Sequence, residues 1–194
     1  MQLPTKQGEL LSYIAKETAR MSYPGSMSRG KKPVVRKDTK KALENYFCKN
    51  VPMEEVWDSA KNNLADTYEK WHRKRVEEIS GAIETYVPSH NQPLSVSAKF
   101  LNTFMHQLMK YEPTRPLFSK LHLPLDSRVF SKFRTIQSSA LKKLTFFNQS
   151  PYAISYDLHE QTQKTLWEFI DELNARPDAE FSIFSRIELN WLWL

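Results

Sequence analysis

The scarcity of glycine is the feature that most restricts how this chain can fold. Only 4 of the 194 residues are glycine, about 2% against a usual share of ~7%. Glycine supplies the positive φ angles of β-hairpins and tight turns. The low glycine content therefore argues against a β-barrel, a β-sandwich or a Rossmann fold. We predict an all-α fold, a compact multi-helix domain whose corners are made by Pro, Ser and Asn.

Apolar residues recur at steps of three and four along most of the chain, which is the period of an amphipathic helix. Roughly seven to nine helices are predicted, in one domain that spans residues 1–194, a length that suits a single domain. Asp126 suits an N-cap, since its carboxylate can accept hydrogen bonds from the free N–H groups of a first helical turn. The expected helices cover 7–21, 53–86, 95–110, 127–136, 138–144, 155–173 and 184–194.

The charge and cysteine content limit the function classes. A net charge of +6 favours an anionic partner, with nucleic acid first. The chain has a single Cys, which excludes an internal disulfide framework. Its five His are scattered along the sequence and form no recognisable zinc-binding motif. No Walker or Gly-x-Gly-x-x-Gly loop occurs, so we expect no cofactor and no metal. The sequence has no long apolar run and does not begin like a secretory signal peptide. We therefore expect a cytoplasmic protein without membrane contact.

A basic stretch lies in residues 22–41, predicted as a loop or arm that leads into a helix near Asp38. It contains Lys31, Lys32 and Arg36. These side chains can contact phosphate groups without reading sequence, or they can belong to a solvated linker.

Two short segments carry residue types suited to chemistry on an electrophilic carbon. In residues 94–102, small residues lead into a helix that holds Lys99 among apolar neighbours. Apolar walls and the positive helix end favour the neutral amine, so we predict a lowered pKa for Lys99. The second segment, 123–133, places Asp126 at a helix start. A carboxylate there stays ionised and can stabilise a developing cation.

These segments resemble the helix-hairpin-helix DNA glycosylases. Val96, Lys99 and Asn102 fall in register with the hairpin-lysine motif of that family, and residues 124–129 are similar to the Pro-x-Asp-x-Arg-Val form of its archaeal 8-oxoguanine branch. The closing residues 187–193 resemble the acid-plus-Trp helix of the same branch. The likeness covers residues 90–135 and, more loosely, the C-terminus. Ser95 and Ser97 stand where the family has hairpin glycines.

The resemblance implies a DNA glycosylase, with or without an AP lyase step, that flips out and excises a damaged or modified base. Lys99 would attack the sugar C1′ and Asp126 would stabilise the oxocarbenium-like sugar. The role would be DNA repair; the divergence of the N-terminal half from repair enzymes of this family adds the hypothesis of defence against phage DNA that carries modified bases. The implied partner is double-stranded DNA, bound by a monomer without cofactor.

The resemblance also implies contacts around the flipped nucleotide. The base pocket would be lined by Glu188, Trp191 and Trp193. Phe146 or Phe147 would act as a wedge in the duplex. Ser95, Ser97 and Arg128 would contact DNA, together with Lys31, Lys32 and Arg36 of the basic stretch.

Two other functions are compatible with the sequence. One is a non-catalytic helical protein that binds DNA through its basic residues. The other is a small helical ribonuclease, for which Arg115 and His122 are the best candidates. Loss of RNA cleavage on removal of His122 would identify the ribonuclease, and a covalent DNA adduct through Lys99 would identify the glycosylase.

Overall fold

The computed structural model describes residues 7–23, 25–28, 32–49, 56, 68–111, 117–177, 179 and 182–193. All regular elements in these residues are helical, which confirms the all-α prediction. The α-helices are α1 (Gln7–Ser22), α2 (Thr39–Lys49), α4 (Tyr68–Ile83), α5 (Pro93–Leu108), α6 (Ser127–Thr135) and α7 (Tyr156–Asn174). Short 3-10 helices are η1 (Gly25–Ser28), η3 (Glu84–Tyr86), η5 (Leu141–Lys143) and η6 (Arg186–Trp193).

Local capping residues set where several helices begin. Asp126 precedes α6 and accepts hydrogen bonds from the backbone N–H groups of Arg128 and Val129, as the sequence predicted. Ser155 caps α7 in the same way, and Pro93 opens α5 at a position where its missing N–H costs nothing. Of the helix predicted over 53–86, the second half is α4, and most of the first half lies outside the described residues.

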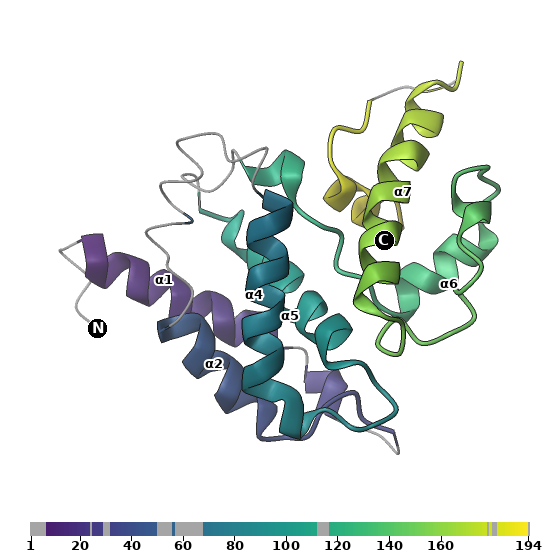
Figure 1. The fold of residues 1–194 in the computed structure, drawn as a ribbon. Helices are drawn as coiled ribbons and strands as arrows, with labels where there is room; N and C mark the ends of the chain where they lie inside the picture. Colours follow the sequence, from purple (N-terminus) through teal and green to yellow (C-terminus); the bar gives the residue numbers. More distant parts are fainter. Residues whose placement is uncertain are drawn as a thin grey trace.

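The helices form two lobes, each with its own hydrophobic cluster (Figure 1). In the N-terminal lobe, α1, α2, α4 and α5 pack around a stacked pair of rings, Phe47 and Phe104, whose centroids are 4.2 Å apart. In the C-terminal lobe, α6 and α7 enclose a cluster around Phe130 and Phe169. The sequence pattern did not reveal this division, because it indicates which residues are buried but does not indicate which other residues they pack against.

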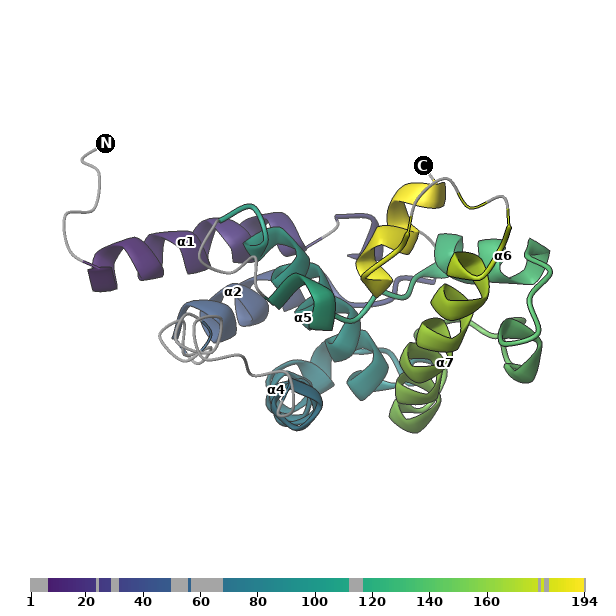
Figure 2. The ribbon, with the colours of Figure 1, turned by 90° about the horizontal axis from the view of Figure 1, so that it is seen from above.

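An extended segment, 121–126, leads from the N-terminal lobe into the C-terminal lobe (Figure 2). Leu121 is buried in the N-terminal cluster, whereas Leu123 and Leu125 are buried in the C-terminal cluster. The segment is thus anchored on both sides, and it ends at Asp126, the cap of α6. It therefore fixes the position of α6 relative to α5.

The described part of the basic stretch is a packed loop and not a free arm. Val35 is fully buried, and the backbone N–H of Arg36 donates to the carbonyl of Tyr86. The side-chain amide of Asn91 donates to the carbonyl of Val34. Helix α2 follows at Thr39, next to Asp38 as predicted.

Candidate functional site

Lys99 and Asp126 lie in contact where the two lobes meet. The Lys99 Nζ atom is 3.1 Å from Asp126 Oδ2 and 3.5 Å from the carbonyl oxygen of Pro124. Lys99 lies in the second turn of α5, and Asp126 caps α6 in the other lobe. The roles predicted for Lys99 and Asp126 both concern the sugar of one nucleotide, and the structure brings the two side chains together.

The two oxygens of Asp126 have separate partners. Oδ1 accepts both backbone N–H groups, each at 3.0 Å, which leaves Oδ2 to receive Lys99. Burial alone would raise the pKa of the Asp126 carboxyl, but the charge of Lys99 and the hydrogen bonds outweigh it and lower that pKa. Asp126 is therefore held as an ionised carboxylate in a fixed orientation.

Lys99 is a largely buried lysine with a weakened proton affinity. Its side chain is 11% exposed, and burial lowers the pKa of the amine even though the Asp126 charge opposes this change. The predicted direction is confirmed, and the main cause is burial. A lysine of this kind supplies the neutral amine that acts as a nucleophile more readily than a surface lysine does.

Ser95 and Ser97 do not have the surface positions that phosphate contacts require. Both lie inside α5 and are at most 2% exposed. The Ser95 hydroxyl donates to the carbonyl of Ile154, and the Ser97 hydroxyl donates to that of Pro93, both at 2.7 Å. The loop that contains Ile154 covers the start of α5, so the prediction that these two serines contact DNA is wrong.

The wedge prediction for Phe146 and Phe147 is also wrong. The two rings are 7% and 6% exposed and belong to the hydrophobic cluster of the C-terminal lobe. The ring of Phe147 packs edge-on against Phe130, with centroids 5.0 Å apart. Both phenylalanines are core residues of the C-terminal lobe, and neither is available to enter a duplex.

The other residues predicted to contact DNA or the base differ in their exposure and in whether the structure describes them. Lys32, Arg36 and Arg128 are exposed, and they stay candidates for phosphate contacts. The Glu188 carboxylate accepts the backbone N–H of Phe184 at 2.7 Å, next to the start of η6. Lys31 and the side chains of Trp191 and Trp193 lie outside what the structure describes.

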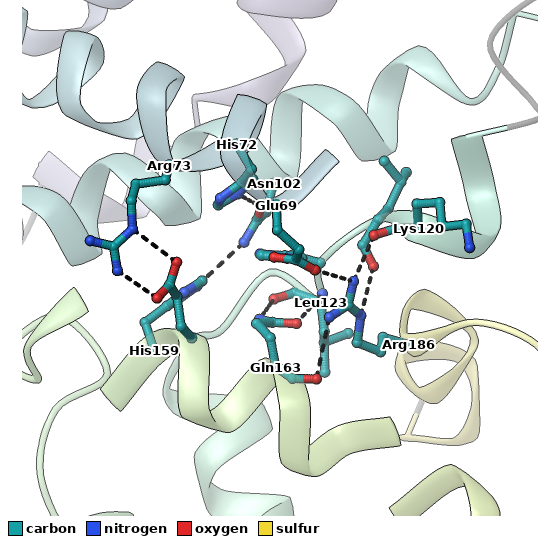
Figure 3. A network of polar contacts seen from close by, with 12 residues as sticks. Glu69, His72, Arg73, Asn102, Lys120, Leu123, His159, Gln163 and Arg186 are labelled. Carbon is teal, nitrogen blue, oxygen red and sulfur yellow. Dashed lines mark hydrogen bonds and ion pairs between the residues drawn. The ribbon is translucent and has the colours of Figure 1, made fainter. Parts of the chain in front are cut away.

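A buried polar network that the sequence analysis missed joins the lobes (Figure 3). His72 in α4 has Asn102 at 2.7 Å on one ring nitrogen and the Tyr156 hydroxyl at 2.9 Å on the other. The amide of Asn102 also reaches His159 in α7, at 3.4 Å. Each histidine interrupts the apolar face of its helix, and this pattern was the signal that could have revealed the network.

A second part of the network holds the extended segment in place. Arg186 is 2% exposed and donates to the carbonyls of Lys120, Leu121 and Gln163, at 2.6, 3.2 and 3.3 Å. The Gln163 side chain accepts the N–H of Leu123 and donates to its carbonyl, at 2.9 and 2.8 Å. These contacts tie the backbone just before Asp126 to α7 and η6 (Figure 3).

A third buried histidine, whose ring centroid lies 4.1 Å from that of His72, argues against the ribonuclease alternative. His122 is fully buried, and its Nε2 lies 2.7 Å from the Glu69 carboxylate. A general base for RNA cleavage must reach its substrate, which this position prevents. Arg115, its proposed partner, lies outside the described residues.

In the described ranges, no group of three or more His, Cys, Asp or Glu is arranged to hold a metal ion.

The buried histidines predict a loss of stability in mild acid. Burial lowers the pKa of His72 to about 4 and of His159 to about 3, and that of His122 well below its usual value. The unfolded chain takes up these protons near pH 6.5, whereas the folded chain does not. The free energy of unfolding is therefore expected to be highest above about pH 6.5 and to fall by roughly 1.4 kcal/mol per pH unit for each neutral histidine below it.

Urea unfolding at a series of pH values from about 7.5 to 5 measures this slope, in a range where most carboxylates stay ionised. A variant His159→Asn should show a shallower slope, while His90→Asn, in an exposed loop, should keep that of the wild type. A free energy of unfolding that stays constant over this range would contradict the assignment of neutral buried histidines.

Comparison of the chain with protein-family models, with curated proteins and with solved structures finds no match. None of the described helices combines the length and the apolar character needed to span a membrane.

Proposed function

We propose that this protein is a DNA glycosylase that uses Lys99 to remove a damaged or modified base. The observation that carries the proposal is the contact of a largely buried lysine with an ionised aspartate, at 3.1 Å, where two lobes meet. A lysine in this state suits nucleophilic attack, and the carboxylate beside it suits a cationic sugar. The sequence resemblance supplies the reaction class for this pair.

The reaction proceeds through a covalent bond between Lys99 and the sugar. The neutral amine forms a bond to C1′ as the bond between C1′ and the base breaks. The base leaves with the bonding electron pair and takes up a proton, while the nitrogen loses its extra proton to solvent. The sugar ring then opens to a Schiff base, which water hydrolyses to release Lys99. In the lyase branch, loss of a proton from C2′ expels the 3′-phosphate and nicks the strand.

Asp126 stabilises the positive charge that develops on the sugar as the base departs. Its carboxylate is suited to this role because two backbone N–H groups keep it ionised and oriented. The Asp126 side chain is only 30% exposed, so its attraction to the sugar cation is stronger than it would be in water. The exposed Lys32, Arg36 and Arg128 add phosphate contacts, which makes binding sensitive to salt.

Replacing Asp126 by Asn is expected to lower the rate of base release by about 10²- to 10³-fold. The amide keeps an oxygen that can cap α6 but has no charge to stabilise the sugar cation. Single-turnover release of the base from duplex DNA measures the rate, and urea unfolding checks that the fold is kept. An unchanged rate in a folded Asp126→Asn variant would remove Asp126 from the mechanism.

The activity is tested by incubating the protein with duplexes that each contain one altered base. One set contains damaged bases, chiefly purines, and represents repair. The other set contains the modified bases of phage DNA and represents defence. New abasic sites in one set would support the glycosylase and identify its role. Binding to the duplexes without any base release would favour the non-catalytic DNA-binding protein.

A further inference from the structure

One face of α5 continues from Lys99 to a histidine that the reaction above does not use. Lys99, Thr103 and His106 are spaced at i, i+4 and i+7, so they share one face of the helix. The Thr103 hydroxyl donates to the carbonyl of Lys99 at 2.8 Å, and is satisfied within the helix. Asn102, at i+3, is already hydrogen-bonded to His72 and His159, so His106 is the next group on this face with polar atoms to offer.

The His106 ring is half-buried, and within the described ranges it forms no hydrogen bond or ion pair. Burial and the charges of Lys110 and Lys99 lower its pKa. The imidazole is consequently neutral near pH 7, with one N–H donor and one acceptor nitrogen.

The spacing along the helix matches the length of a base. Seven residues correspond to a rise of about 10 Å along the helix between the Cα atoms of Lys99 and His106, a length comparable to that of a nucleobase with a hydrogen bond at its far edge. If the sugar lies at the Lys99 amine, a base that extends over Thr103 brings its far edge to His106. The edges of nucleobases display donors and acceptors, both of which a neutral imidazole can pair.

We infer that His106 is a specificity-determining residue that hydrogen-bonds to the edge of the base removed at Lys99. The inference rests on the proposed function and adds the chemical class of its ligand, a base with a polar group on the edge remote from the sugar. This placement differs from the pocket that the sequence resemblance implied at the C-terminus. It uses α5 alone to position both the nucleophile and the group that reads the base.

The test compares one substrate that has a base with one that lacks it. His106→Leu is expected to slow single-turnover excision of the altered base by about 10- to 100-fold. The same variant should form the borohydride-reduced adduct with an abasic duplex at the wild-type rate, within about twofold, because an abasic site offers His106 nothing to bind. His106→Gln, which keeps a donor and an acceptor, should recover part of the excision rate.

The controls separate this inference from the proposed function. His90→Leu, in an exposed loop, should match the wild type on both substrates. Equal slowing of excision and of adduct formation by His106→Leu would indicate a structural effect on Lys99 and overturn the inference. So would an unchanged excision rate. Either result leaves the glycosylase intact if the wild type excises a base, whereas a wild type that excises none removes the proposed function together with the inference.

Discussion

Replacement of Lys99 by Gln is expected to abolish the borohydride-reduced adduct with abasic DNA and to lower base release by roughly 10³-fold or more. Glutamine has a similar length and polarity, but its amide nitrogen is not a nucleophile. The cap of α6 is kept, because Asp126 Oδ1 accepts its two N–H groups without help from Lys99. The loss is therefore chemical, and urea unfolding of the variant should confirm a folded protein.

The matched control for this change is Lys132→Gln. Lys132 is an exposed lysine in the last turn of α6, and its loss alters the net charge by the same amount. The control should keep the adduct and nearly all of the base release. An adduct of wild-type yield in Lys99→Gln would mean that another amine reacts, and the role assigned to Lys99 would be wrong.

Replacement of Arg186 by Met is expected to lower the free energy of unfolding by about 3–5 kcal/mol. Methionine fills much of the space, but the hydrogen bonds to the three backbone carbonyls and the ion pair of Arg186 with Glu69, at 3.6 Å, are lost. Unpaired buried acceptors carry the full cost of their desolvation. Urea unfolding of the wild type and the variant measures the difference.

Arg176→Met is the corresponding control, because Arg176 is exposed beyond the end of α7. It should change the free energy of unfolding by less than about 0.5 kcal/mol. If Arg186→Met were as mild as this control, the three hydrogen bonds would contribute little to holding the lobes together. The extended segment 121–126 would then be held in place mainly by Gln163 and by the buried leucines.

The helical class and the helix cap at Asp126 could be predicted because their signals are local. Helical periodicity appears within a few turns, and a capping aspartate is recognised from its immediate neighbours. The pairing of Lys99 with Asp126, 27 residues apart, came from a likeness between two short segments. No periodic pattern would have joined them, since residues this far apart meet only through the path of the chain between them.

Positions that depend on the packing of distant segments were predicted less well. Ser95 and Ser97 are small polar residues at a helix start, where exposure is the usual outcome, yet the loop around Ile154 covers them. Phe146 and Phe147 follow two lysines, which suggested a surface, but they complete the core of the C-terminal lobe. The histidine network likewise assembles from α4, α5 and α7, and a sequence pattern does not show which helices become neighbours.

The most direct test of the mechanism is to locate the covalent bond in the reduced adduct. Wild-type protein is incubated with abasic duplex and borohydride, digested with a protease, and the peptide that carries the nucleotide remnant is identified by mass spectrometry. The mechanism predicts that the remnant is attached to the Nζ of Lys99. A remnant attached to any other lysine or to the α-amino group, or the absence of an adduct, would contradict it.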